Sequence, residues 1–487
     1  MKYLFISLLL LWLVPITVGQ PQPPALTRTI QQVETGLRSA VELAGQPIAT
    51  YSIADRMKHY KIPAVSIAVV NNGQIEWAKA YGFLRADGTQ KVDTQTLFQA
   101  ASISKPISAL GALRLVEQGK LDLDTDVNKY LTSWKVKPSR FTSEKPVTLR
   151  GLLTHTAGLT VHGFNGYGPG KAVPTLVQVL NGEKPANSPA VISDTVPGSR
   201  WQYSGGGYVI VQQLIEDITG QPFADYMQQT ILTPIGMSTH STFRQPLPAE
   251  LQQNTSIAHA NNGTRIPGDW HVYPEQAPAG LWTTPSDLAR YIISVQQSLA
   301  GTATPVLSQS MTRQMLTKHL GNYGLGPGLG GKDSLMTFGH GGGNEGYRCF
   351  LYAFQQTGQG VVIMTNSDNG MDLINEMLRS VSQVYDWKVF KPTIKKLAVI
   401  PPEQLMKLAG RYVGQGDRKP VLEVTVKGRS LQVKQSWDGH TFTLLPEAER
   451  AFFLEDEGAP FTFDVAADGT INSLLAFGSD RWTRINE

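Results

Sequence analysis

A mainly apolar pattern covers residues 106–116. It is apolar around nearly the whole circumference of a helix, with Arg114 and Glu117 as the main polar breaks. A helix of this kind is buried on all sides instead of lying on a surface. Pro106 suits a first helical turn, and Gly119 is a suitable C-terminal stop. The pattern therefore predicts a buried helix with Ser102 and Lys105 at its entrance.

Shorter patterns predict strands and further helices around this helix. Residues 64–81 have the pattern of two strands separated by Asn71-Asn72-Gly73, a strong hairpin signal. Residues 348–354 and 360–365 are typical of strands, and residues 209–219 have helical spacing. Another helix is expected to begin after a cap at Thr284 or Ser286. Strands and helices therefore both contribute to the first four fifths of the chain.

The pattern changes beyond residue 386. Residues 391–404 contain three prolines and no firm periodicity, which is typical of a linker. From residue 408 onward, short alternating segments are separated by turns at Lys427-Gly428, Asp438-Gly439 and Asp468-Gly469. Regular short strands with such turns predict a small antiparallel barrel or sandwich without a catalytic cluster. The predicted division is a leader over 1–19, a main domain over 20–390, a linker over 391–404 and a β-domain over 405–487.

Composition and charge narrow the class of protein. At 487 residues the chain exceeds one ordinary core, so two or three domains are expected. With 41% hydrophobic and 17% charged residues, it has the composition of a folded globular protein. The formal net charge is +4 without any Lys/Arg cluster, so nucleic acid is not an expected partner. The histidines are scattered and His-Glu-x-x-His is absent from the sequence, so neither a catalytic metal nor another cofactor is expected.

The N-terminal residues predict export. Lys2 is followed by an apolar run from Leu4 to Val18 and then by small residues, as in a secretory signal peptide. Cleavage before Gln20 would place the protein in the periplasm or outside the cell without a stable membrane span, and an uncleaved anchor is the alternative. Cys349 is the only cysteine, so no internal disulfide can form. Its strand-like surroundings favour a small buried residue over a nucleophile.

Ser102 and Lys105 form the strongest candidate for chemistry. Three residues apart on a helix, they share a face and can touch. Burial and the positive end of the helix dipole both disfavour the charged ammonium, so Lys105 can accept the serine proton. The alternative is that Ser102 is a helix cap and Lys105 a surface lysine. Ser-x-x-Lys is a weak motif by itself, but it occurs once in this sequence, at the entrance to the most apolar helix.

Other polar residues adjoin glycine runs or helix ends. His155 resembles a base, although a role in capping the turn between Thr154 and Thr156 is favoured. Tyr203 precedes a glycine run at the start of a helix, and the alternative reading is a core tyrosine with a satisfied hydroxyl. His340 lies in Gly-His-Gly-Gly-Gly, where glycines allow the backbone to approach a ligand closely. The dinucleotide-binding context and Gly-x-Ser-x-Gly are both absent from the sequence, which argues against those two folds.

Three motifs occur in a recognisable order: Ser102-Ile-Ser-Lys105, Tyr203-Ser-Gly205 and His340-Gly-Gly342. This set resembles the serine β-lactamase and penicillin-binding protein family, in particular its class C, D-peptidase and esterase branch. The segments 152–159 and 279–288 are similar to secondary signatures of the same branch. The resemblance covers about residues 53–389. It implies an α+β fold, with an antiparallel sheet flanked by helices beside a helical subdomain, and the C-terminal segment resembles lipocalin-like β-domains.

The resemblance also implies roles for individual residues. Ser102 would be the acylated nucleophile and Lys105 its proton acceptor. Tyr203 would share the base role and return a proton to the leaving group. His340 stands where the family more often has Lys, and its charge would be able to change near neutral pH. The N–H groups of Ser102 and Gly343, beside Gly342, would form the oxyanion hole.

One departure from the family pattern affects the expected substrate. The middle motif often ends in Asn, but Gly205 holds that place, so an amide that would hold Lys105 and the substrate carbonyl is missing. Efficient β-lactam hydrolysis is therefore less expected than acyl transfer in general. The favoured function is a secreted serine hydrolase acting on a small ester, amide or D-amino-acid peptide. The alternatives are a non-catalytic binding protein or sensor and a true class C-type β-lactamase, and the oligomeric state stays open.

Overall fold

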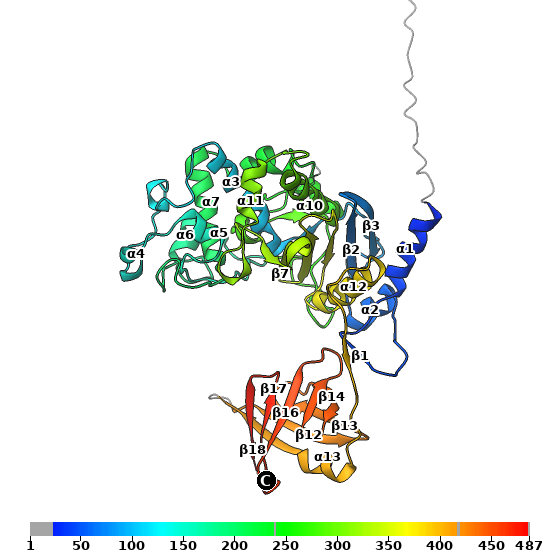
Figure 1. The fold of residues 1–487 in the computed structure, drawn as a ribbon. Coiled ribbons are helices and arrows are strands. Elements are labelled where there is room, and N and C mark those ends of the chain that lie inside the picture. Colours follow the sequence, from blue (N-terminus) through cyan, green and yellow to red (C-terminus); the bar gives the residue numbers. More distant parts are fainter. Residues whose placement is uncertain (1–22, 238–239, 416–418, 486–487) are drawn as a thin grey trace, which may run out of the picture. The chain divides into compact units, whose positions relative to one another are not determined.

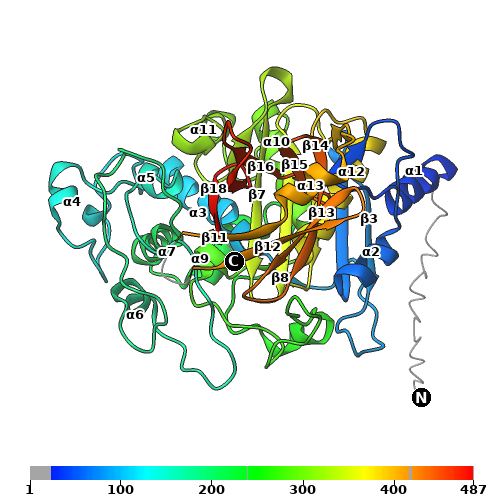
Figure 2. The same ribbon diagram turned by 90° about the horizontal axis from the view of Figure 1, so that it is seen from below.

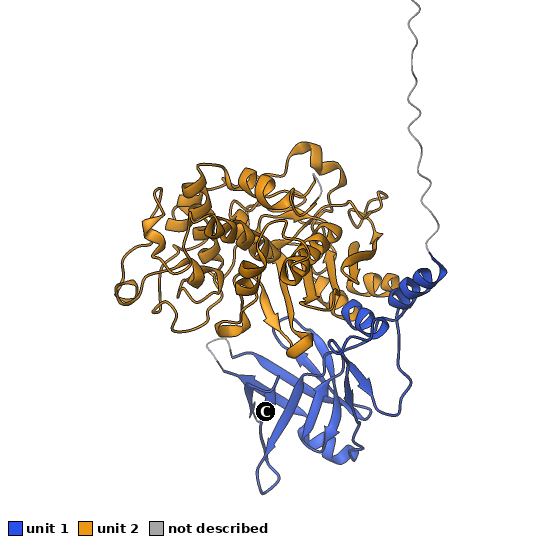
Figure 3. Cartoon of the chain, turned by 45° about the horizontal axis from the view of Figure 1, so that its top comes forward, with its two compact units in different colours: residues 1–52, 377–487 blue, residues 53–376 orange. Residues whose placement is uncertain are grey.

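The computed structural model describes residues 23–237, 240–415 and 419–485. The predicted signal peptide lies outside these residues. In the described part of the chain, no helix combines the length and apolarity needed to cross a membrane. Contacts divide the chain into a larger unit, Ile53–Glu376, and a smaller one formed by Met1–Ser52 and Met377–Glu487 (Figure 3). The domain boundaries expected from the sequence remain a prediction.

An antiparallel sheet forms the centre of the larger unit, with strand order β3-β2-β9-β8-β7-β6. Its strands are β2 (Ala64–Asn71), β3 (Gln74–Gly82), β6 (Gly328–Gly330), β7 (Thr337–Asn344), β8 (Tyr347–Phe354) and β9 (Gly360–Thr365). The predicted hairpin is confirmed: Asn72 and Gly73, at its turn, have φ of 52° and 71°, the left-handed conformations that a tight hairpin favours. Every residue of β9 is buried, as in a strand covered on both faces.

Helices cover the sheet and extend to one side of it. Helix α10 packs on β2, β3 and β9, while α3, α7 and α9 pack against one another beside the sheet (Figures 1 and 2). The helices of this unit are α2 (Ile53–Tyr60), α3 (Ser104–Glu117), α4 (Arg140–Glu144), α5 (Leu149–Leu153), α6 (Leu176–Asn181), α7 (Gly205–Thr219), α8 (Phe223–Met227), α9 (Gln276–Ala279), α10 (Pro285–Ala300) and α11 (Gln309–Met315). Two further short strands, β4 (Phe98–Gln99) and β5 (Trp282–Thr283), pair beside the start of α3. This arrangement confirms the expected α+β class.

Helix α3 is the buried helix that the sequence predicts. Its residues from Ser104 to Leu113 are all buried. A 3-10 turn, η1 (Ala101–Ile103), leads into the helix, and the chain leaves it through Gly119 with φ of 69°. Because the helix is packed on all sides, the turn at its N-terminus is held in a fixed place in the core.

The smaller unit contains a closed antiparallel barrel in the order β11-β12-β13-β14-β15-β16-β17-β18. Its strands are β11 (Gly410–Gly414), β12 (Val421–Lys427), β13 (Ser430–Gln435), β14 (Thr441–Ala448), β15 (Ala451–Leu454), β16 (Pro460–Val465), β17 (Ile471–Ala476) and β18 (Asp480–Ile485). Alternate residues such as Leu422 and Val424 point into an apolar core. The barrel predicted from the alternating pattern is confirmed.

The predicted linker contains regular structure. Within residues 391–404, β10 (Thr393–Lys395) pairs in parallel with β1 (Val41–Leu43). Helix α13 begins at Pro402 and ends at Leu408, and it buries Leu405 and Leu408 in the barrel core. The smaller unit also includes α1 (Pro24–Thr35), and α12 (Gly370–Val384) runs across the division between the units. The prolines therefore mark the ends of short elements here and do not imply a structureless stretch.

Candidate active site

The turn before helix α3 presents Ser102. Ala101 has φ of 47°, a left-handed conformation that is strained for a residue with a side chain. The carbonyl of Ala100 accepts hydrogen bonds from the Ile103 N–H and the Cys349 thiol, both at 3.0 Å. These contacts fix the backbone on either side of Ser102. They also show Cys349 as the buried packing residue that its sequence context predicts.

Lys105 lies about one helical turn after Ser102, and its amine contacts the Ser102 hydroxyl directly. Its Nζ is 2.9 Å from Ser102 Oγ and donates to the carbonyl of Pro278 at 3.0 Å. The lysine is only 2% exposed, and this burial lowers its pKa from 10.5 to about 7. A large fraction of the amine is therefore neutral near pH 7 and able to accept a proton. The alternative of a surface lysine is wrong.

Tyr203 completes a group of three polar side chains. The Lys105 Nζ lies 4.9 Å from its ring centroid. Burial raises the pKa of Tyr203 to about 12, and the interaction of its hydroxyl with Ser102 opposes part of that rise. The phenol is therefore protonated near neutral pH and suited to relaying a proton. The next residue, Ser204, caps α7 by accepting from the Gly207 N–H at 2.9 Å.

His340 lies on β7 near the same group. The Tyr203 and His340 ring centroids are 6.1 Å apart, and His340 Nε2 is 3.4 Å from the hydroxyl of Tyr323. Burial, together with nearby Lys105, lowers the pKa of His340 to about 4. The expectation that its charge changes near neutral pH is therefore wrong, because it assumed the ordinary pKa of an exposed imidazole. A neutral His340 can orient a substrate by hydrogen bonding without adding a charge beside Lys105.

The glycines of the site differ in what surrounds them. A Cβ on Gly342 would lie 2.4 Å from the Ala100 carbonyl oxygen, so only glycine lets β7 approach the turn that carries Ser102. Gly343 is exposed on β7 beyond the residues paired with β6. Its N–H as an oxyanion donor remains a prediction. The structure thus gives Gly342 a packing reason for being glycine.

Gly205 begins helix α7, two residues after Tyr203. A Cβ there would lie 2.9 Å from Cε2 of Phe164 and 3.2 Å from the carbonyl oxygen of His162. The space in which an Asn side chain would start is therefore occupied by the loop that precedes α6. Lys105 donates instead to the carbonyl of Pro278, a partner that the sequence did not single out.

His155 has a different place from the one predicted. Its ring does not cap the local turn: Nδ1 accepts from the N–H of Ser204 at 3.1 Å, and the ring centroid lies 4.2 Å from that of Tyr203. Burial lowers its pKa well below the ordinary value. Tyr323, whose ring centroid is 5.0 Å from His155, also belongs to this cluster and was missed. No short sequence pattern links residues 155, 203 and 323, so only the fold reveals the cluster.

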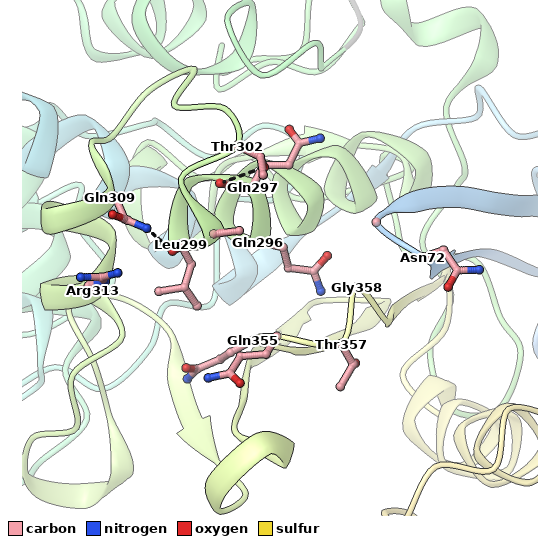
Figure 4. Close-up of a pocket in the computed structure, with 13 residues that line it drawn as sticks. Asn72, Gln296, Gln297, Leu299, Thr302, Gln309, Arg313, Gln355, Thr357 and Gly358 are labelled. Carbon is pink, nitrogen blue, oxygen red and sulfur yellow. Dashed lines mark hydrogen bonds between the residues drawn. The ribbon is translucent and has the colours of Figure 1, made fainter.

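A separate cavity of about 660 Å³ lies at the end of the sheet, among the turns that follow β2 and β8 and the ends of α10 and α11 (Figure 4). Amide side chains line it, including Gln296, Gln309 and Gln355, together with Arg313. None of Ser102, Lys105, Tyr203 and His340 borders this cavity.

Among the described residues, no group of three or more His, Cys, Asp or Glu side chains is arranged to hold a metal ion.

The cluster around Ser102 has the parts required for acyl transfer. A hydroxyl touches a buried amine, and a phenol lies near enough to the same hydroxyl for it to affect the pKa of that phenol. A nucleophile is activated in this way when an adjacent base can take its proton. The sequence-predicted residues Ser102, Lys105, Tyr203 and His340 are therefore brought together in one place by η1, α3, the start of α7 and β7.

The chain is similar in sequence to known proteins. Penicillin-binding protein 4 of Amycolatopsis lactamdurans is 27% identical over 384 residues, covering 74% of this chain and 95% of its own length. Protein flp of Staphylococcus aureus (strain MRSA252) is 27% identical over 230 residues, so the match spans 46% of this chain and only 42% of flp.

Solved structures show the same fold at low identity. The octameric penicillin-binding protein homologue from Pyrococcus abyssi has a TM-score of 0.60 and 24% identity, with 89% of this chain and 98% of that one covered. The D-amino acid amidase from Ochrobactrum anthropi SV3 has a TM-score of 0.57 and 19% identity, with 74% and 98% covered. A model of the family described as Beta-lactamase matches residues 52–384, well over half of the chain, and this protein therefore belongs to the beta-lactamase family.

Proposed function

We propose that this protein is a secreted serine hydrolase that works through an acyl-enzyme on Ser102. The observation that carries the proposal is the contact of 2.9 Å between Ser102 Oγ and the buried Lys105 Nζ. A small ester, an amide or a D-amino-acid peptide is the proposed substrate. The fold shared with a D-amino acid amidase and the sequence similarity to a penicillin-binding protein support a substrate with a reactive carbonyl group. Export rests on the signal-like N-terminal sequence.

The proposed reaction has two halves. Ser102 Oγ attacks the substrate carbonyl while its proton passes to Lys105, and the negative oxygen is held by backbone N–H groups, for which Ser102 and Gly343 are the candidates. The bond to the leaving group then breaks as that group takes a proton relayed by Tyr203. A water molecule then attacks the acyl group and gives one proton to Lys105, and the Ser102 Oγ takes up that proton as it departs and releases the acid. Each proton transfer of this kind contributes about 10²–10⁴-fold in rate.

Because Gly205 stands where the family often has Asn, we expect different rates of hydrolysis for different substrates. A β-lactam adduct is hindered, and its deacylation depends on donors that hold the acyl group and on a well-placed base. A short acyl chain is less hindered, so its adduct should hydrolyse without the missing amide. We expect turnover of p-nitrophenyl acetate and slow hydrolysis or trapping of a chromogenic cephalosporin. Brisk cephalosporin hydrolysis without esterase activity would make this protein a β-lactamase despite Gly205.

Covalent labelling tests the proposal. The wild-type protein should react with a fluorescent fluorophosphonate or penicillin, and Ser102→Ala should not react while its thermal melt stays nearly unchanged. Ser108→Ala is the matched control, because Ser108 lies on the same helix and only donates to the Ala277 carbonyl at 3.0 Å. Undiminished labelling of Ser102→Ala would refute the assigned nucleophile. A folded wild-type protein that neither labels nor turns over any ester, amide or D-amino-acid peptide in a panel would favour the non-catalytic binding protein.

A further inference from the structure

His155 is bonded to both neighbours of Tyr203. The carbonyl of His155 accepts from the Gln202 N–H at 2.8 Å, and its Nδ1 accepts from the Ser204 N–H at 3.1 Å. Between these two bonds, the Tyr203 ring lies against the imidazole at 4.2 Å between centroids, with 33° between the ring planes. A single residue therefore fixes the backbone before and after Tyr203 and also supports its ring.

The backbone of His155 has a conformation that residues with large side chains ordinarily avoid. Its φ is 60°, a left-handed conformation in which Gly and Asn are favoured and larger side chains are uncommon. It follows the short helix α5, whose last residue, Leu153, accepts a hydrogen bond from the hydroxyl of Tyr208 at 3.1 Å. The tertiary contacts of the ring therefore hold the residue where the isolated chain would disfavour it. Strain of this kind is found where a side chain must be aimed.

The ring is neutral and does not face solvent. Because Nδ1 accepts a backbone N–H, the proton of the neutral imidazole sits on Nε2. That nitrogen is buried and has no hydrogen-bond partner among the described residues. The ring is instead surrounded by Tyr203, Tyr208, Tyr323 and Trp201, at centroid distances of 4.2 to 6.4 Å. His155 is therefore placed to support Tyr203 and not to exchange protons with a substrate.

We propose that His155 is a positioning residue that holds the Tyr203 hydroxyl in register with Ser102 and Lys105. The inference rests on the proposed function, because it concerns the relay through Tyr203. The phenol of Tyr203 must stay within hydrogen-bonding reach of Ser102 while the leaving group departs. A displacement of about 1 Å at such a group costs about 10²-fold in rate. Loss of the support should therefore reduce the chemical step and leave substrate binding nearly unchanged.

Three substitutions separate the two kinds of support. His155→Asn places an acceptor oxygen where Nδ1 was and suits the left-handed backbone, but it removes the ring. His155→Phe keeps a ring and removes the acceptor, and His155→Gly removes both while keeping the backbone conformation. With an amide or alkyl ester from the substrate panel, whose leaving group must take a proton, His155→Gly should lower kcat about 10²-fold with little change in KM. The kcat values of the Asn and Phe variants should fall between those of His155→Gly and the wild type. Each kcat is expressed per amount of protein that circular dichroism shows to be folded.

The matched control is His259→Phe. His259 is also fully buried, and its Nε2 accepts the Ala86 N–H at 3.1 Å, outside the group around Ser102. This variant should lose stability and keep its kcat per folded molecule. An equal loss of kcat in His259→Phe would mean that removing any buried histidine has this effect, and would overturn the inference.

A double-mutant cycle decides whether His155 acts through Tyr203. In a Tyr203→Phe background, His155→Gly should cause little further loss of kcat, because the hydroxyl that it positions is already gone. Multiplicative losses in the double variant would show that His155 acts elsewhere and would overturn the inference. If Tyr203→Phe alone keeps wild-type turnover, the proposed relay fails and the inference fails with it. If Tyr203→Phe is slow but the His155 variants are as fast as wild type, only the inference is overturned.

Discussion

Lys105 should make the protein less stable at neutral pH than it would be with an apolar residue in the same place. Burial lowers its pKa from 10.5 to about 7, so in the pH range between these values the unfolded chain binds a proton that the folded chain does not. Unfolding then takes up one proton, and the free energy of unfolding rises with pH over that range. Below about pH 7 both states are protonated, and the full cost of the buried ammonium is present.

The size of the effect follows from the two pKa values. Each pH unit between 7 and 10.5 is worth about 1.4 kcal/mol, which gives about 5 kcal/mol over the whole range. Lys105→Met removes the titrating group and keeps a side chain of similar length. Hydrogen bonds to Ser102 and Pro278 are lost as well, but their contribution is a constant offset at pH values where the folded amine is neutral. The advantage of Lys105→Met over wild type should therefore shrink by about 1.4 kcal/mol per pH unit between pH 7.5 and 9.5.

Urea unfolding of both proteins at half-unit steps from pH 6 to 9.5, followed by circular dichroism, measures this slope. Lys120→Met is the control, because Lys120 is exposed and its substitution should give a difference without such a slope. The esterase activity of the wild type should rise with pH through about pH 7 as Lys105 becomes neutral. A stability difference that stays constant from pH 7 to 9.5 would refute the lowered pKa and with it the neutral lysine base.

The remaining predictions concern packing around the site. Gly342→Ala should lose about 1–3 kcal/mol of stability through its backbone clash, whereas Gly341→Ala, whose Cβ would come no closer than 3.6 Å to its nearest neighbour, the Phe350 ring, should lose less; urea unfolding compares the two. Gly205→Asn should leave cephalosporin hydrolysis slow because Phe164 occupies the space, and a faster rate in the single variant would contradict this packing. The thiol of Cys349 should react with Ellman's reagent only on unfolding, because burial raises its pKa, and fast reaction of the native protein would show that it is accessible.

The parts of the site that residue spacing alone revealed, without the family resemblance that pointed to Tyr203 and His340, are those set by local geometry. Ser102 and Lys105 are three residues apart, so a helical turn alone brings them together once the apolar pattern has predicted the helix. The capping choice between Thr284 and Ser286 was also local, and Thr284 accepts from the Asp287 N–H at 3.2 Å. The alternation beyond residue 408 was enough to predict a barrel, because inward and outward positions repeat every two residues.

The missed parts depend on contacts between distant segments. The Pro278 carbonyl reaches Lys105 across 173 residues of sequence, and a carbonyl carries no residue-specific signal. His155 was assigned to a local turn because its partner, Ser204, is 49 residues away. The Gly- and Pro-rich composition of segment 163–187 is typical of a loop, yet the segment contains α6, which starts at a capping box formed by Thr175 and Gln178. Composition described the segment as a whole and obscured the signal within it.

The closure of the barrel has a consequence for the order of folding. Strand β11 pairs with β12 on one side and with β18 on the other, so Tyr412 lies opposite Leu422 and also opposite Arg484. The last of these pairings joins residues about 70 positions apart, and contacts of that separation form slowly. Until residues 480–485 have been synthesised, β11 and β17 each present an unpaired edge, which is a template for association with other chains. A nascent chain would therefore be most prone to aggregation just before β18 is complete. At that point nearly all of the barrel strands have formed, but the edges of β11 and β17 are still unpaired.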